Sequence, residues 1–236
     1  MSKLDLRLDD KIAVITMDEA DNKLNLDMCD AFLSLLDRVE NETDALTLVV
    51  RSGHPHIWSN GFDLDWVNAR LAAGDKDSVS RFLIRDMDLR IRLLSYPLIT
   101  IAAFNGHVFG GAAVLSCCFD FRFMRSDRGY FCIPVVDRGY PVVHGTRELL
   151  RSVLPLSLVP DLILTGRRLT GLECAAGNVV SAAYPNDELM DKVMTFARGL
   201  NKGRRIIGQM KKVLNDRITR LMEEDKVILK QGDVRV

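Results

Sequence analysis

Two glycine-containing turns in this sequence have the composition to present backbone amides to an anionic oxygen. One lies in 57–64, where an apolar segment is followed by Gly61 and a predicted helix. The other lies in 97–113, where an apolar segment is followed by Gly110, Gly111 and a second predicted helix. Glycine permits tight turns, and the first amides of a helix have no acceptor within that helix. Two such turns can converge on one carbonyl oxygen, which is the arrangement of an oxyanion hole.

The sequence gives little support for a metal site or for a serine hydrolase. His54 and His56 flank a proline with no Asp or Glu at metal-ligand spacing, so we expect no metal site. The sequence contains no G-x-S-x-G segment, which argues against a serine hydrolase of that type. The chemistry must therefore come from the two turns and from ionisable side chains that the fold brings to them.

The strands and helices that position these turns are visible as patterns of apolar residues. The predicted strands span 4–8, 12–17, 46–51, 98–104, 120–125 and 130–133. The predicted helices span 78–95, 145–153, 158–164, 186–201 and 204–224, and Asp27 is expected to cap a further helix. Strands alternate with helices in the first half and helices follow alone. This order indicates an α/β fold with a helical C-terminal layer.

Composition limits the class of protein. The chain has 236 residues, 47% of them apolar, with 32 basic and 32 acidic side chains. This length and apolar content predict one folded domain, and zero net charge gives no field to attract nucleic acid or an anionic membrane. The longest apolar stretch, 108–119, is too short to cross a bilayer. Five cysteines, of which Cys117 and Cys118 are adjacent and the others scattered, form no CxxC pair and are expected to be buried free thiols of a cytoplasmic protein.

Four segments match the signatures of one known family. Residues 58–64 read W-S-N-G-F-D-L, and 97–111 carry the apolar strand, the Asn-Gly turn and the Gly-Gly pair. They resemble the [FW]-S-x-G-x-D-L and P-x-I-A-x-x-N-G-x-x-x-G-G signatures of the crotonase superfamily, the enoyl-CoA hydratases and isomerases. Segments 120–123 and 164–170 are similar to further family positions. The details resemble most the Δ3,Δ2-enoyl-CoA isomerases.

This resemblance implies a crotonase-type spiral of ββα units in residues 1–185, followed by a helical trimerisation region, 186–236, in one continuous domain. It implies an oxyanion hole for a thioester carbonyl, made by the amides of Phe62 and Gly111. The residues implied to contact coenzyme A are Ser59, Asn60, Gly61, Asp63 and Leu64. Coenzyme A would arrive as part of the acyl-CoA substrate, with no separate cofactor. The assembly would be a homotrimer or a dimer of trimers.

The sequence departs from the family where proton transfer is concerned. Family hydratases use two glutamates and isomerases need one, but Val114 and Val135 occupy those positions here. Asp137 lies two residues beyond Val135 and would point the same way in an extended segment, so it is one candidate for proton transfer. His144 is the other, because imidazole transfers protons near neutral pH and some relatives place an alternative acid nearby.

Two functions therefore remain open. One is an enzyme of the enoyl-CoA isomerase or hydratase type that stabilises a thioester enolate in fatty-acid or related acyl-CoA metabolism. The alternative is a non-catalytic acyl-CoA-binding homologue that keeps the hole without the glutamates. Basic side chains near the C-terminus form either the solvated face of a helix or a contact with coenzyme A phosphates: Lys202, Arg204, Arg205, Lys211, Lys212, Arg217 and Arg220. Neither a nucleic acid nor a membrane is expected as a partner.

Overall fold

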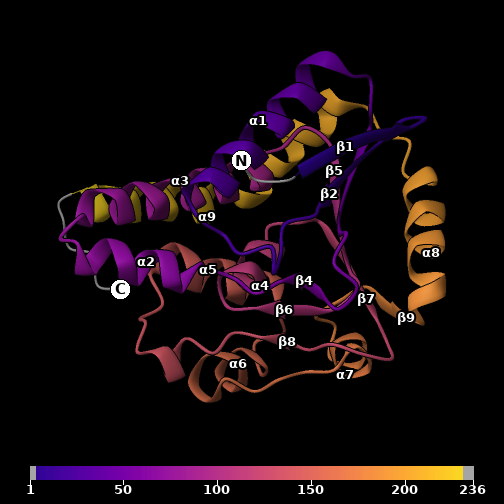
Figure 1. The fold of residues 1–236 in the computed structure, drawn as a ribbon. Coiled ribbons are helices and arrows are strands. Elements are labelled where there is room, and N and C mark those ends of the chain that lie inside the picture. Colours follow the sequence, from indigo (N-terminus) through magenta and orange to yellow (C-terminus); the bar gives the residue numbers. More distant parts are fainter. Residues whose placement is uncertain (1–3, 231–236) are drawn as a thin grey trace.

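The computed structural model describes residues 4–230, which form two β-sheets surrounded by helices (Figure 1). The strands are β1 (Leu4–Asp9), β2 (Ile12–Met17), β3 (Thr47–Ser52), β4 (Ile57–Ser59), β5 (Ile99–Phe104), β6 (His107–Phe109), β7 (Phe121–Arg125), β8 (Phe131–Cys132) and β9 (Ala182–Tyr184). The helices are α1 (Leu26–Glu42), α2 (Leu64–Ala72), α3 (Lys76–Leu94), α4 (Gly111–Ser116), the 3₁₀ turn η1 (Val136–Arg138), α5 (His144–Val153), α6 (Val159–Thr165), α7 (Gly171–Ala176), α8 (Asn186–Arg198) and α9 (Arg204–Lys230). The predicted α/β class is confirmed.

The middle of the chain repeats a unit of two strands followed by a helix. In each unit the first strand joins a six-stranded sheet of order β1-β2-β3-β5-β7-β9, and the second joins a three-stranded sheet of order β4-β6-β8. Neighbouring strands from successive units pair in parallel in both sheets. Equivalent strand–helix turns therefore stack beside one another, as in the spiral of ββα units that the sequence resemblance implied. β1 and β2 form the expected antiparallel hairpin.

Both faces of the larger sheet are buried, because successive strand residues point into two different apolar cores. Val50, Ala102 and Phe104 belong to the main core, together with residues of α1, α3 and α4. Ile101 and Phe123 point the other way and pack with α8, which covers the outer face in Figure 1. Strands buried on both faces are expected to be apolar throughout, as β5 is.

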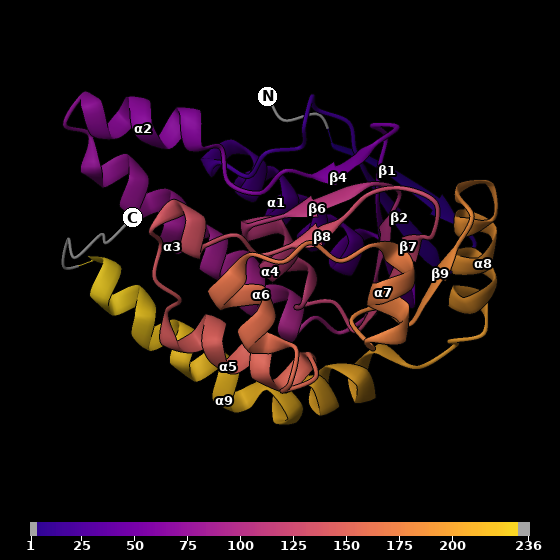
Figure 2. The ribbon, with the colours of Figure 1, turned by 90° about the horizontal axis from the view of Figure 1, so that it is seen from below.

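The last two described helices form the layer predicted after residue 185. α8 contributes Leu189 and Val193 to the outer core, and α9 contributes Ile218 and Met222 to the main core. Figure 2 shows α9 running along α3 and α5, with which it is in contact. The C-terminal helical layer is therefore confirmed and shares its cores with the rest of the fold. Its role in trimerisation stays a prediction.

One local expectation is wrong. Asn25, and not Asp27, caps α1, because the Asn25 side chain accepts a hydrogen bond from the Met28 amide at 3.0 Å. Both residue types accept such bonds equally well, and Asp27 lies in the first turn instead.

The five cysteines are buried and unpaired, as expected. Within residues 4–230, no helix is long and apolar enough to span a membrane, and no three metal-ligating side chains come together.

Candidate functional site

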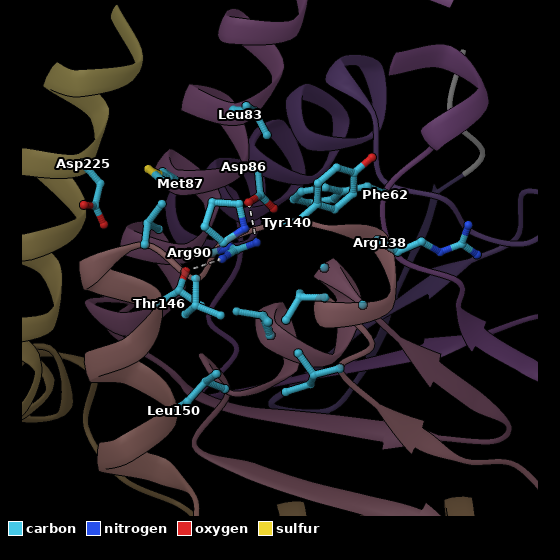
Figure 3. Close-up of a pocket in the computed structure, with 18 of the residues that line it drawn as sticks. Phe62, Leu83, Asp86, Met87, Arg90, Arg138, Tyr140, Thr146, Leu150 and Asp225 are labelled. Atoms are coloured by element: carbon cyan, nitrogen blue, oxygen red, sulfur yellow. Dashed lines mark hydrogen bonds and ion pairs between the residues drawn. The ribbon is translucent and has the colours of Figure 1, made fainter. Parts of the chain in front are cut away.

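A cavity of about 490 Å³ lies where α3, α5 and α9 meet the turns that follow the smaller sheet (Figure 3). Much of its wall is apolar, with side chains such as Leu83, Met87, Val142 and Leu150. Clefts of this volume take up small organic ligands. Both glycine turns recognised in the sequence reach this wall, since Phe62 and residues 109–111 line it.

The first turn is held by pairing with Leu24 on both sides of Phe62. The Leu24 amide donates to the Gly61 carbonyl at 2.7 Å, and the Asp63 amide donates to the Leu24 carbonyl at 2.8 Å. Because successive amides of an extended segment point in opposite directions, the Phe62 amide faces away from Leu24. It donates a hydrogen bond to no other residue in 4–230.

The second turn leaves another amide free. Gly111 is the first residue of α4, so its amide has no acceptor within the helix. On either side the backbone is occupied, because the Gly110 amide donates to the Cys132 carbonyl at 2.9 Å and the Gly110 carbonyl accepts from the Val114 amide at 3.1 Å. The Gly111 amide itself donates to none of the residues that the structure describes.

The two turns are in direct contact, which explains the glycine at both positions. A Cβ on Gly61 would lie 3.0 Å from the Gly111 nitrogen and 2.5 Å from the Phe109 carbonyl oxygen, and Gly61 has a φ of +82°. A Cβ on Gly111 would lie 2.5 Å from two ring carbons of Phe62. Neither contact leaves room for a side chain. The two free amides therefore belong to contacting turns on the wall of one cavity.

The five residues expected to contact coenzyme A divide into two groups. Asn60 and Leu64 line the cavity. Ser59, Gly61 and Asp63 do not line it and instead shape the turn. The Ser59 hydroxyl accepts from the Gly61 amide at 3.3 Å, and the Asp63 carboxylate caps the first turn of α2. Contact of this segment with coenzyme A stays a prediction.

The residues considered for proton transfer lie in different surroundings. Val114 and Val135 line the cavity, so the positions of the family glutamates face it with apolar side chains. Asp137 and His144 are exposed and do not line it, so their expected placement at the site is wrong. Asp137 lies in η1, where the chain turns instead of extending, and its carboxylate lies beside Gly166. His144 is the first residue of α5.

The cavity wall also holds a buried ion pair that the sequence analysis did not single out. Asp86 Oδ2 lies 2.6 Å from Arg90 Nη2, and Arg90 Nη1 donates to the Thr146 hydroxyl at 3.2 Å (Figure 3). Asp86 is 2% exposed, and this burial raises the pKa of its carboxyl group, while the charge of Arg90 opposes the rise. The available signal was the four-residue spacing of Phe82, Asp86 and Arg90, which places two charges on the buried face of α3.

Comparison with known proteins identifies the family to which this chain belongs. The chain matches the family described as enoyl-CoA hydratase/isomerase over residues 7–231. Enoyl-CoA delta isomerase 2, peroxisomal, of Arabidopsis thaliana is 30% identical over 194 residues, which cover 80% of this chain and 79% of that protein. Carnitinyl-CoA dehydratase of Salmonella arizonae is 29% identical over 136 residues, covering 57% and 52% of the two chains.

Solved structures share the fold over nearly the whole chain. A probable enoyl-CoA hydratase of Mycobacterium tuberculosis has a TM-score of 0.87 at 21% identity, covering 97% of this chain and 96% of that chain. Human mitochondrial delta3-delta2-enoyl-CoA isomerase has a TM-score of 0.87 at 16% identity, covering 97% and 89%. The predicted crotonase fold is therefore confirmed.

Proposed function

Because the chain belongs to the enoyl-CoA hydratase/isomerase family, we propose that it binds an acyl-CoA thioester and stabilises its enolate through the amides of Phe62 and Gly111. The observation that carries this proposal is the pair of amides without protein acceptors, in contacting turns on one cavity wall. An enolate forms when a proton leaves the carbon beside the thioester carbonyl and negative charge moves to the oxygen. One fixed donor at such an oxygen contributes a factor of about 10²–10³ in rate.

The cavity suits the acyl part of such a substrate. Its wall carries Leu83, Met87 and Leu150, which offer apolar contact to a hydrocarbon chain. Asn60 and Leu64, from the turn that supplies the Phe62 amide, lie on the same wall and would contact the part of the substrate next to the thioester. Coenzyme A would then enter as the carrier of the acyl group, with its adenine end outside the cavity.

Isomerisation of a double bond is the favoured reaction within this proposal. Hydration requires a pair of side chains to activate water, and the two family glutamate positions hold Val114 and Val135. Moving a double bond along the acyl chain needs one group that takes a proton and returns it. The isomerase relative from Arabidopsis thaliana, which is 30% identical to this chain, supports the same choice.

A second candidate function is binding of acyl-CoA without turnover. The apolar side chains of Val114 and Val135 favour it, because they remove the family's proton-transfer groups while both free amides remain. Such a protein would hold the thioester carbonyl and leave the α-carbon unchanged.

To distinguish the two candidate functions, the protein is incubated with a 3-enoyl-CoA and with a 2-enoyl-CoA. Double-bond migration and hydration are followed by absorbance. Binding of a saturated acyl-CoA is measured in parallel by calorimetry. Migration of the 3-enoyl double bond supports the isomerase. Binding with neither migration nor hydration would establish the non-catalytic alternative, and absence of binding would contradict both.

The homotrimer or dimer of trimers is part of this proposal. Exposed apolar side chains on α9 support association of several chains, because Met210, Val213 and Leu214 are at least half exposed on one helix. Light scattering coupled to size-exclusion chromatography should give three or six times the 26.5 kDa of one chain. A mass equal to one chain would contradict the assembly and leave the proposed chemistry untouched.

A further inference from the structure

The proposed reaction needs a group that transfers a proton, and the two family glutamate positions supply no such group in this chain. Val114 and Val135 occupy them. Among the described residues that line the cavity, the carboxylates are Asp86 and Asp225, and neither a histidine nor a cysteine is present. Asp225 is committed to the start of α5, because its Oδ2 accepts from the Gly145 amide at 2.7 Å. Asp86 is therefore the carboxylate left to consider.

Asp86 lies on the part of α3 that covers the first glycine turn. One helical turn before it, the Phe82 ring packs edge-on against the Phe62 ring, with centroids 5.0 Å apart. One turn after it, the Arg90 guanidinium carbon lies 6.0 Å from the centroid of the same ring. Residues four apart on a helix share a face, so Asp86 lies between these two contacts. Because the Phe62 ring lies over Gly111, Asp86 is at the end of the cavity that holds both free amides.

The two oxygens of this carboxylate differ. Oδ2 is paired with Arg90, whereas Oδ1 is buried and accepts a hydrogen bond from none of the residues in 4–230. Leaving a buried acceptor without a partner costs about 1–3 kcal/mol. Buried ion pairs can often be replaced by apolar residues without loss of stability, so the fold alone does not explain this one. Burial also raises the pKa of Asp86, which makes its carboxylate a stronger base.

We propose that Asp86 is the catalytic residue that transfers the proton in this chain, an inference that rests on the proposed function. Oδ1 takes a proton from the α-carbon of a 3-enoyl-CoA, and the electron pair of that C–H bond moves into a dienolate whose oxygen the two amides hold. The protonated Asp86 then gives its proton to the γ-carbon, while the double bond forms between the α- and β-carbons. The proton taken from the α-carbon is the one delivered to the γ-carbon, so the reaction needs no other reactant.

Shielding of Asp86 gives this proposal a distinctive consequence. The side chain is 3% exposed, so the proton it carries is held away from bulk water between the two steps. A deuterium taken from the α-carbon should therefore reach the γ-carbon of the same substrate molecule more often than it is lost to solvent. A base open to solvent would lose most of the label.

The experiment uses a 3-enoyl-CoA deuterated at the α-carbon and compares the wild type with Asp86→Asn. Asparagine keeps the shape of the side chain and its hydrogen bond to Arg90 but accepts no proton. We expect the rate of double-bond migration to fall about 10²–10⁴-fold, while affinity for a saturated acyl-CoA changes less than about threefold. The wild-type product should carry deuterium at the γ-carbon.

Asp88→Asn is the matched control, because Asp88 lies two residues along α3 and pairs with Arg85 and Lys226 without lining the cavity. It should keep the wild-type rate. An Asp86→Asn rate within about threefold of the wild type would overturn the assignment and leave the proposed function standing. A wild type that moves no double bond would contradict the proposed function itself. Should Asp86→Asn not fold, Asp86→Leu with Arg90→Met removes both charges, and migration by that variant would equally overturn the assignment.

Discussion

The ring of Phe62 lies directly over the α-carbon of Gly111, so that a Cβ on Gly111 would fall 2.5 Å from the Cδ1 and Cε1 atoms of that ring. Contacts this short do not occur between real atoms, and the ring would have to move. Because the ring belongs to the residue whose amide is proposed to hold the thioester, the contact links the two halves of the site.

Gly111→Ala should therefore displace Phe62 and impair the site more than it impairs the fold. We expect double-bond migration to slow about 10²-fold, as for loss of one donor, and the free energy of unfolding to fall by about 1–3 kcal/mol. Gly203→Ala is the control, since its Cβ would meet nothing within 4 Å. Initial rates and chemical denaturation measure the two effects. Wild-type rates in Gly111→Ala would show that the ring position does not matter to the reaction.

Glutamate at the two family positions should have unequal effects on stability. Val114 is 4% exposed within the main core, so Val114→Glu buries an unpaired carboxylate and should cost roughly 3–5 kcal/mol. Val135 is half-buried at the cavity wall, and Val135→Glu should cost about 1 kcal/mol. Urea denaturation of both variants at pH 7 checks the difference. Equal losses would contradict the distinction in burial.

Arg90→Met should destabilise the fold in a pH-dependent way. Without Arg90, Asp86 is a buried unpaired charge, which costs roughly 3–5 kcal/mol at pH 7. Burial already raises the pKa of Asp86, so the folded state binds the proton more tightly than the unfolded chain and gains stability as the pH falls. Burial, and to a smaller extent the charge of Asp86, raises the pKa values of the Cys29 and Cys118 thiols, so both stay protonated.

The deficit of Arg90→Met relative to the wild type should accordingly shrink as the pH is lowered from 7 to about 5. Denaturation curves for both proteins at several pH values measure it. A deficit that grows toward acidic pH would mean that Asp86 is not the group left unpaired.

The cysteines should be inert in the folded protein. Burial raises the pKa of Cys174 to about 12 and raises the pKa of Cys132 as well, and the five thiols are all buried. Thiolate is the reactive form, so a disulfide reagent at pH 8 should titrate five thiols only after denaturant is added. Rapid reaction of the native protein would place at least one thiol at the surface.

Local sequence signals predicted the two turns well. Each combines a buried strand, a glycine and a helix start, and the structure places Phe62 and Gly111 in contact. The same kind of reasoning failed at Asp137. An extended segment after Pro134 would have aligned Asp137 with Val135, but the chain forms a 3₁₀ turn there, and alternation no longer applies.

The sequence could not reveal contacts between side chains that lie far apart along the chain. Asp86 and Arg90 read as ordinary charges on a long helix until the fold brings Phe62 and Thr146 beside them. The sequence predicts Lys211 either on the solvated face of the C-terminal helix or in contact with coenzyme A phosphates, yet it is 5% exposed. Its ammonium group lies 2.7 Å from Asp120, which comes 91 residues earlier in the chain. Periodicity along one helix does not reveal such a partner.

The proposed function requires that the two amides donate hydrogen bonds to a thioester carbonyl. The most direct test is the carbonyl stretching frequency of a bound acyl-CoA that carries ¹³C at the thioester carbon. Isotope-edited infrared spectra are compared for the wild type and for a protein in which phenyllactate replaces Phe62. That replacement keeps the ring and exchanges the amide N–H for an oxygen atom. The frequency should fall on binding to the wild type and should return part of the way to its solution value in the ester variant. An unshifted frequency in the wild-type complex, or an equal shift in both proteins, would contradict the account.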